Sequence, residues 1–328
     1  MPPEASPSEL AKRVLDGDRS AVSNALNLVD DDRPRHRKRA LELLDALEGR
    51  GHGARIGVTG APGSGKSTLL DAVVSGLRGR SRSVGILAVD PSSQRTGGAL
   101  LGDRMRLGPR SRDAGVFLRS MAARDQLGGL SEATGPSLDV LVAAFDAVFV
   151  ETVGVGQSEA EVIDIVDSLV FVAQPAAGDL IQFMKAGILE WPDIFFVNKS
   201  DLGDAATRTA AELRAGLELG RRRDAEFAPP VLTGSARDGV GIDELIDALD
   251  AHREHLLGSG ALAIRREHGR AARVRSALTT RYGRFGLARL HGRLEIESFM
   301  QDRADESVDR IVTELGHAIE NAIAADAG

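Results

Sequence analysis

The sequence contains no cysteine, and among its 328 residues only one tryptophan and one tyrosine. The absence of thiols excludes disulfides, iron–sulfur clusters and thiolate zinc sites. Long apolar runs are also missing. None approaches the roughly 20 residues that a membrane-spanning helix requires, and the opening residues have neither a basic start nor an apolar stretch. We therefore expect a cytoplasmic protein with no membrane partner.

A surplus of positive charge is absent as well. The formal net charge is -7 at pH 7, which gives no reason to expect a nucleic-acid partner. The rest of the composition is ordinary for a soluble globular chain, with 42% hydrophobic and 27% charged residues. This length and composition predict one large domain with additions, or two domains.

The chain begins with a helical pattern and then changes to a strand pattern. Residues 8–48 place apolar side chains at helical spacing, which predicts a small helical N-terminal region over residues 1–50. After that region, short apolar runs alternate with helical segments, an arrangement typical of a parallel sheet with helices on both sides. We therefore expect an α/β fold with a doubly wound, mostly parallel sheet over residues 51–257. Seven runs are the candidate strands: residues 55–60, 83–90, 115–120, 146–153, 168–174, 193–199 and 229–236.

Beyond Leu257 the sequence is helical again. A Gly-Ser-Gly break opens a helical C-terminal extension, residues 258–328, which contains an amphipathic stretch over 307–324. This extension is too short to form a core of its own comfortably, so we expect it to pack on another surface. That surface is either the sheet domain of the same chain or a second copy, in which case the extension is a dimerisation arm. The apolar positions of the stretch recur at spacings of three and four: Val308, Ile311, Leu315, Ile319 and Ile323.

The clearest motif follows the first candidate strand. Residues 60–67 read Gly-Ala-Pro-Gly-Ser-Gly-Lys-Ser and lead into a predicted helix, which is the strand–loop–helix context of a P-loop. Glycines let the loop wrap a phosphate with its backbone N–H groups pointing inward, and the start of the helix adds a favourable dipole. Lys66 supplies charge for the β and γ phosphates, and Ser67 places its hydroxyl on Mg²⁺. The predicted binding residues are Gly60, Pro62, Gly63, Ser64, Gly65, Lys66, Ser67 and Thr68.

Two carboxylates are predicted at the same edge of the sheet. Asp90 ends the second candidate strand, which is reached from the first through one helix, and such a crossover places Asp90 beside the phosphate loop. Asp90 can hold Mg²⁺ directly or through water, and the alternative is a cap in the turn Asp-Pro-Ser-Ser. Glu151 follows the strand DAVFV and precedes Gly154 by three residues, the spacing of a γ-phosphate sensor.

The segment after Glu151 is predicted to be a switch. The acid contacts the Mg²⁺ shell, the N–H of Gly154 contacts the phosphate, and Gly156 lets the loop move between nucleotide states. Gln157 either orients the attacking water or is merely a surface residue. Both readings of Gln157 remain open at the level of sequence.

Recognition of the base is predicted after the sixth candidate strand, where Asn198, Lys199 and Asp201 reach the same edge. An aspartate accepts two hydrogen bonds from the guanine ring N–H and exocyclic amine, a pair that adenine does not present. The motif therefore favours GTP over ATP. Ser235 and Ala236 would add backbone contacts to the guanine carbonyl, or would only cap the next helix. Together these motifs predict a Mg²⁺-dependent P-loop GTPase that hydrolyses GTP to GDP by in-line attack of water.

The assembled motifs resemble the MeaB/ArgK family, the GTPase chaperones of adenosylcobalamin-dependent acyl-CoA mutases such as methylmalonyl-CoA mutase. The resemblance runs from about Leu10 to about Leu257. It rests on segments beyond the general GTPase motifs: VTGAPGSGKSTLLD, LAVDPSS, GGALLGDRMR, VETVGVGQSE, and PAAGD followed by KAGILE and VNKSD. It implies a G protein that binds a mutase and controls both the loading of intact cobalamin and the expulsion of damaged cofactor. It also implies slow GTP hydrolysis until the partner reshapes the site, and a homodimer contact from the C-terminal extension.

The resemblance also assigns residues around the metal. It places Asp103, in LLGDRMR, in the first switch, together with Asp90 and Glu151 as acids near Mg²⁺. The motifs contain no evident arginine finger. Arg104 or Arg106 in the glycine-rich segment could serve, as could a residue of the partner.

The chain departs from the family pattern after PAAGD. Where the family has a segment resembling DLQAIKAG, residues 180–187 read LIQFMKAG, with bulky Phe183 and Met184. The family uses this stretch as a further switch that faces the partner. The change therefore indicates either a different mutase or an amphipathic helix with Phe183 and Met184 in the core.

Two other functions share parts of this pattern. A P-loop metabolite kinase or transport-related ATPase needs ATP selectivity, against which the base motif at 198–201 argues. A metal-inserting GTPase needs metal ligands, but cysteine is absent and the 7 histidines are scattered. His252 and His255 form the only close pair, and we expect an exposed pair on a polar helix rather than a metal site.

Overall fold

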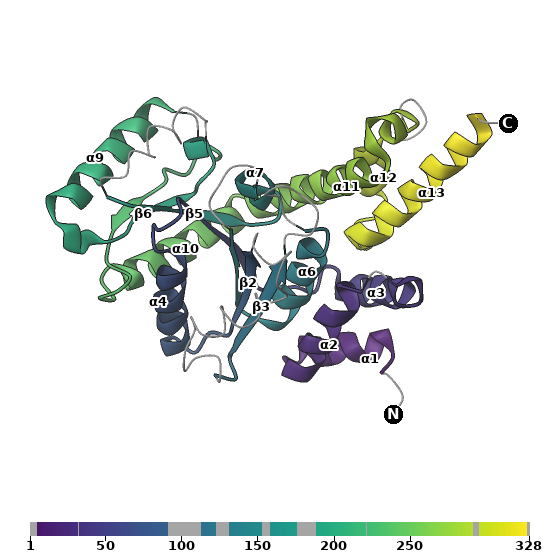
Figure 1. Cartoon of the computed structure of the whole chain (residues 1–328), viewed down its shortest axis with the longest axis horizontal. Helices are drawn as coiled ribbons and strands as arrows, with labels where there is room; N and C mark the ends of the chain where they lie inside the picture. The colour runs from purple at the N-terminus through teal and green to yellow at the C-terminus, as the bar shows by residue number, and fades with distance from the viewer. Residues whose placement is uncertain are drawn as a thin grey trace. The chain divides into compact units, whose positions relative to one another are not determined.

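The computed structural model describes residues 5–31, 33–90, 113–122, 131–152, 158–175, 188–220, 222–290 and 295–326. The chain divides into two compact units. The first, here called the sheet unit, comprises Ala54–Ser131 and Phe145–Ile264. The second, the helical unit, comprises three stretches of chain: Met1–Gly53, Glu132–Ala144 and Arg265–Gly328. Figure 1 labels many of the helices and strands of the two units.

The described part of the sheet unit contains a sheet of seven strands in the order β3-β2-β4-β1-β5-β6-β7. Every pairing between neighbouring strands is parallel. Each of the seven predicted apolar runs overlaps one of these strands, so the predicted P-loop α/β fold class is confirmed. The strands are β1 (Ala54–Thr59), β2 (Val84–Asp90), β3 (Val116–Ala122), β4 (Ala147–Glu151), β5 (Ser168–Ala173), β6 (Ile194–Val197) and β7 (Val231–Thr233).

Helices cover both faces of this sheet. Because successive residues of a strand point to opposite faces, alternate residues pack against different helices. In β6, Ile194 and Phe196 pack in one core cluster with residues of α4 and α10, whereas Phe195 and Val197 pack in another with residues of α9. Both faces are buried, as expected for a parallel sheet. The helical elements of this unit are α4 (Lys66–Gly79), α7 (Ser158–Ile163), η3 (Ile188–Glu190), η4 (Ser200–Leu202), α9 (Asp204–Leu219) and α10 (Ile242–Gly258).

The strand order determines where a ligand can bind. β1 lies between β4 and β5 in the sheet, and the chain runs from β1 through α4 to β2 on one side, then later to β5 and β6 on the other. In open α/β sheets such a reversal leaves a crevice at the carboxyl ends of the strands. The loop after β1 opens into that crevice.

The helical unit contains the predicted N-terminal helices and a helix from the middle of the chain. α1 (Pro7–Leu15), α2 (Arg19–Val29) and α3 (Pro34–Leu47) each contact α6 (Thr134–Ala144). The side chain of Ser6 caps α1 by accepting from the N–H of Glu9, and that of Asp18 caps α2. The predicted helical character of residues 8–48 is confirmed.

The C-terminal helices share a hydrophobic core, so the expectation that they are too short to form one is wrong. Val274 and Leu278 of α11 (Ala261–Ala288), Met300 of α12 (Ile296–Gln301) and Ile311, Leu315 and Ile319 of α13 (Val308–Asp326) are all buried in it. α11 passes from the sheet unit into the helical unit and is interrupted at Gly283. Ion pairs between Arg310 and Asp45 and between Arg270 and Glu48 tie these helices to the end of the N-terminal helices.

Among the described residues, no helix combines the length and hydropathy needed to cross a membrane.

Candidate nucleotide site

The loop between β1 and α4 has the backbone of a phosphate cradle. Gly60, Gly63 and Gly65 have φ angles of 142°, 79° and 92°, values that residues with a Cβ rarely adopt. A Cβ on Gly60 would lie 2.2 Å from the carbonyl oxygen of Val172, and one on Gly65 would lie 2.4 Å from Nδ2 of Asn198. The loop therefore packs so closely against β5 and against Asn198, which follows β6, that only glycine fits at these two positions.

Lys66 is the first residue of α4, and its side chain is buried. Its Nζ donates to the carbonyl oxygens of Gly60 at 2.8 Å and Ala61 at 3.1 Å. These contacts hold the ammonium group against the loop itself. Of the other predicted loop residues, Pro62 and Thr68 are exposed.

The hydroxyl of Ser64 is buried and has no hydrogen-bond partner within the described part of the chain. An unpaired buried hydroxyl costs free energy unless a ligand or water satisfies it. Its place inside the loop fits a polar ligand such as a phosphate.

Ser67 and Glu151 meet beside the loop, where Oγ of Ser67 donates to Oε1 of Glu151 at 2.5 Å. Ser67 lies in the first turn of α4, and Glu151 is the last residue of β4. A hydroxyl and a carboxylate oxygen are ligands that Mg²⁺ prefers. The structure thus brings together two of the predicted metal-binding residues.

Several predicted residues lie partly or wholly outside the described part of the chain. Asp90 ends β2 at the expected edge, with its backbone paired to Ala122 of β3, but its side chain lies outside the described atoms. Other predicted residues lie wholly outside the described ranges: Asp103, Arg104, Arg106, Gly154, Gly156, Gln157, Phe183 and Met184.

The side chain of Asn198 connects the phosphate loop to the loop that follows β7. Its Nδ2 donates to the carbonyl oxygen of Ser64 at 2.8 Å, and its Oδ1 accepts from the N–H of Ala236 at 2.9 Å. The side chain is buried, and both of its polar ends are satisfied. The role of Asn198 is therefore to fix two loops relative to each other.

Lys199 has the left-handed conformation, with φ of 60°. Its Nζ donates to the carbonyl oxygen of Gly63 at 2.8 Å and to Oε1 of Gln174 at 3.0 Å. Gln174 is a site residue that the sequence motifs do not predict. The available signal was its position one residue beyond β5, at the edge where the other site residues gather.

Asp201, in η4, faces the loop after β7. Its Oδ1 accepts from Oγ of Ser235 at 3.2 Å, and its Oδ2 accepts from Nη2 of Arg237 at 3.3 Å. Arg237 and its neighbour Asp238 were not predicted. The alternative reading of Ser235 and Ala236 as a helix cap is wrong, because α10 begins after Gly241 with no side-chain cap.

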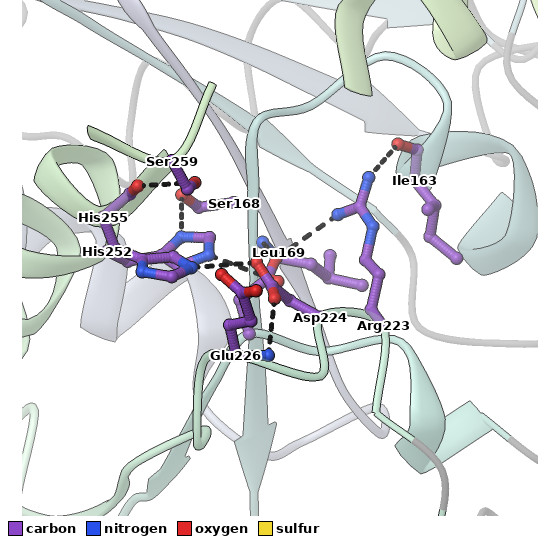
Figure 2. Close-up of polar contacts among 10 residues, drawn as sticks. Ile163, Ser168, Leu169, Arg223, Asp224, Glu226, His252, His255 and Ser259 are labelled. Atoms are coloured by element: carbon purple, nitrogen blue, oxygen red, sulfur yellow. Dashed lines mark hydrogen bonds and ion pairs between the residues drawn. The ribbon is translucent and has the colours of Figure 1, made fainter. Parts of the chain in front are cut away.

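A second polar cluster lies at the opposite ends of the strands (Figure 2). Nδ1 of His252 lies 2.7 Å from Oγ of Ser168, the first residue of β5, and its Nε2 lies 3.4 Å from Oδ1 of Asp193, just before β6. Asp193 also accepts from the backbone N–H of Leu169 at 2.9 Å and from Arg223 at 3.3 Å.

The prediction of an exposed histidine pair is therefore wrong. His252 is fully buried, and His255 is half-buried and pairs with Asp224 at 3.0 Å. The reason is that His252 continues the buried stripe of α10 formed by Leu245, Leu249 and Leu256. Within the described residues, no three histidine or carboxylate side chains gather to hold a metal.

Comparison with known proteins gives the family. A family model described as methylmalonyl-CoA mutase-associated GTPase MeaB matches residues 22–282. A putative GTPase of Pyrococcus abyssi is 44% identical over 260 residues, which is 79% of each chain. A probable GTPase of Mycobacterium tuberculosis is 43% identical over 262 residues, 78% of each chain. The crystal structure of a protein titled LAO/AO transport system kinase superposes with a TM-score of 0.70 at 28% identity, covering 98% of this chain and 99% of that one.

The match spans the phosphate loop, the carboxyl end of β4 and the base strand, which are the parts of the molecule where the site residues meet. It agrees with the seven-stranded parallel sheet and with the guanine motif. The chain therefore belongs to the family of methylmalonyl-CoA mutase-associated GTPases of the MeaB type, and it is a P-loop GTPase that binds guanine nucleotides.

Proposed function

We propose that this GTPase is a nucleotide-dependent chaperone of an adenosylcobalamin-dependent acyl-CoA mutase of the methylmalonyl-CoA mutase type. In this role it gates loading of the cofactor and protects or reactivates the mutase. The observation that carries the proposal is the family match over residues 22–282, because that family is defined by its association with the mutase. The geometry of the site supports a protein that changes its contacts when a nucleotide binds.

The phosphate loop supplies the first of these changes. Lys66 donates to the carbonyl oxygens of Gly60 and Ala61, and the hydroxyl of Ser64 has no hydrogen-bond partner among the described residues. In our proposal, Lys66 exchanges the carbonyl oxygens for phosphate oxygens, and backbone N–H groups of the loop bind the rest of the phosphate. The ammonium charge then stabilises the negative charge of the transferring phosphoryl group.

The oxygen donors of Ser67 and Glu151 fit Mg²⁺, and we propose them as residues that hold this ion, with Asp90 and Asp103 as further acids. When bound there, Mg²⁺ would supply positive charge that offsets the negative charge of the phosphate oxygens. The hydrogen bond from Ser67 to Glu151 keeps the hydroxyl and the carboxylate close together, in a position from which both could bind the ion. Asp201, which lies in η4 after β6, would accept hydrogen bonds from the ring N–H and the exocyclic amine of guanine.

Hydrolysis by the isolated protein is expected to be slow. The nucleotide-binding motifs contain no evident arginine finger, and the two candidates Arg104 and Arg106 lie outside the described residues. A charge supplied by a partner can raise the rate by about 10³ to 10⁵. We therefore expect the mutase to stimulate hydrolysis, which gives a readout besides binding.

A pull-down from native extract tests the proposal. The tagged protein is incubated with GDP, with a non-hydrolysable GTP analogue or without nucleotide, and the captured proteins are identified by mass spectrometry. Recovery of a cobalamin-dependent acyl-CoA mutase in amounts that depend on the nucleotide supports the proposal. Lys66→Ala is the matched variant, since it should abolish that dependence.

The recovered mutase is then purified and returned to the GTPase. Stimulated GTP hydrolysis and nucleotide-dependent transfer of adenosylcobalamin to the mutase are the expected results. If no mutase is captured in any nucleotide state, or if a purified acyl-CoA mutase neither binds nor stimulates the protein, the chaperone role is contradicted while the GTPase assignment stands. Screening for small-molecule phosphate acceptors would then follow.

We also propose that the protein works in the cytoplasm as a homodimer. Most apolar positions of α13 are buried in the helical unit, so we expect a dimer contact to use other residues of the C-terminal extension. Sedimentation of the full chain at several concentrations tests this, and a monomer mass throughout would contradict it.

A further inference from the structure

The carboxylate proposed to read guanine is already engaged by a cation of the same chain. Nη2 of Arg237 donates to Oδ2 of Asp201 at 3.3 Å, and Oγ of Ser235 donates to Oδ1 at 3.2 Å. Guanine requires both of these oxygens, one for its ring N–H and one for its amine. The side chain of Arg237 is 72% exposed, so it is not packed in the protein interior.

Asp238 offers Arg237 a second carboxylate. Nε of Arg237 donates to Oδ1 of Asp238 at 3.1 Å, and its Nη2 reaches Oδ2 at 3.3 Å. The pKa of the Arg237 guanidinium is raised, mainly by Asp238 and further by Asp201, and the pKa of Asp238 is lowered, mainly by Arg237. Arg237 can therefore release Asp201 without losing its ionic partner.

Ser235 also favours Asp238 over Asp201. Its Oγ lies 2.6 Å from Oδ2 of Asp238 and 3.2 Å from Oδ1 of Asp201. A hydroxyl has one proton to donate, and the shorter contact is the stronger one. The donor that satisfies the Asp201 carboxylate in this arrangement is therefore chiefly Arg237.

We propose that Arg237 sets the affinity and specificity of the guanine pocket by competing with the base for the carboxylate of Asp201, and that Asp238 receives Arg237 when guanine enters. This inference rests on the proposed base-reading role of Asp201. In the empty pocket Arg237 neutralises Asp201, which stabilises the nucleotide-free form and speeds the release of GDP. Adenine lacks the pair of donors and cannot displace Arg237, so the competition also adds to the rejection of ATP.

The dissociation rate of a fluorescent GDP analogue tests the proposal. Arg237→Leu removes the charge and all five N–H donors and leaves a shorter, apolar side chain, and it should slow dissociation about two- to fivefold, the range expected for an exposed ion pair. Asp238→Asn removes the alternative carboxylate and should accelerate dissociation. Arg208→Leu, an exposed arginine of α9, is the matched control and should leave the rate unchanged.

Salt provides a readout that a purely structural role would not change. High salt screens exposed ion pairs, so the difference between the wild type and Arg237→Leu should shrink as salt rises. Faster dissociation in Arg237→Leu would mean that Arg237 holds the bound base and would overturn the inference, as would an unchanged rate. The result for Arg237→Leu decides the matter even if Asp238→Asn fails to fold.

A separate variant distinguishes failure of the inference from failure of the base assignment. Asp201→Asn presents one donor and one acceptor, which suit xanthine better than guanine. If this variant keeps its guanine preference, the assignment of Asp201 is wrong. If it shifts toward xanthine while Arg237→Leu has no effect, only the competition by Arg237 is wrong.

Discussion

Asn198 donates from Nδ2 to the carbonyl oxygen of Ser64 at 2.8 Å, and so ties the strand that carries the base motif to the loop that carries the phosphate motif. The same side chain accepts from the N–H of Ala236. One buried amide thus holds the phosphate loop and the loop after β7 at a fixed separation. We therefore expect Asn198 to affect nucleotide binding through the relative position of these loops, whether or not it touches the base.

Substitution Asn198→Ala should lower the free energy of unfolding by about 1–3 kcal/mol, because it leaves a buried carbonyl and a buried N–H without their partner. It should also weaken GDP and GTP alike, since the loops that bind both nucleotides lose their common support. Chemical denaturation and nucleotide titration measure the two effects. Asn24→Ala, on an exposed position of α2, is the control and should change stability by less than about 0.5 kcal/mol. Unchanged stability and binding in Asn198→Ala would contradict the prediction.

Substitution Gly65→Ala should destabilise the loop by about 1–3 kcal/mol and abolish tight nucleotide binding. The reason is that the new Cβ would lie 2.4 Å from Nδ2 of Asn198, at a φ of 92° that alanine disfavours. Thermal unfolding and fluorescence titration with GDP check both effects. Gly79→Ala, in the same helix with no atom near the new Cβ, should leave binding intact and stability equal or slightly higher. Equal behaviour of the two variants would show that the loop is not as tightly packed as described.

Substitution Glu151→Gln tests the proposed metal site. The amide keeps the size of the side chain and can still accept from Ser67, but it removes the negative charge that attracts a divalent cation. We expect the Mg²⁺ concentration for half-maximal GTP hydrolysis to rise about tenfold or more. Magnesium titration of the hydrolysis rate is the measurement. An unchanged titration curve would remove Glu151 from the metal site.

The stability of the helical unit should depend on pH through Asp309. Burial raises the pKa of Asp309 to about 6, from the ordinary value of 3.8, against the opposing charges of Arg273 and Arg37 and with a smaller contribution from Asp139. Because the folded pKa lies above the unfolded one, the stabilising contribution is fully present below about pH 4 and is lost as pH rises through about 6. This group alone should lower the free energy of unfolding by about 1–3 kcal/mol between those conditions and neutral pH.

Asp309→Asn should remove that loss, since the amide does not ionise. Chemical denaturation of the full chain from about pH 5 to about pH 8 should therefore show a variant that gains on the wild type as pH rises. Asp302→Asn, at an exposed aspartate of the same unit, is the matched control. Parallel curves for Asp309→Asn and the wild type would show that Asp309 is not the responsible group.

The sequence predicts the sheet well because each strand is a short apolar run, and the run in β6 is buried on both faces. The phosphate loop and the guanine-recognition motif can be predicted equally well, because the residues of each motif are adjacent in the chain. Gln174, Arg237 and Asp238 are different. Their roles depend on contacts between loops that are far apart in the chain, and local sequence patterns do not predict such contacts.

Two predictions are wrong because neither takes account of where the buried positions lie along the helices. His252 was expected on the surface as a polar residue, although its spacing from Leu249 and Leu256 places it on the buried stripe of α10. The C-terminal extension was judged by its length alone, whereas its three helices bury apolar residues against one another. The attachment of α6 to the N-terminal helices could not be predicted, because it depends on packing between segments far apart in the chain.

The helical unit is assembled from three stretches of chain, with α6 inserted between the two parts of the sheet unit. During synthesis α1–α3 therefore leave the ribosome long before α6. Arg310, the ion-pair partner of Asp45, is synthesised later still. Until those segments emerge, Leu10, Val14 and Leu26 have only their neighbouring helices to cover them. The first helices to be synthesised are thus among the last to reach their final partners, and no single cut in the chain can separate the two units.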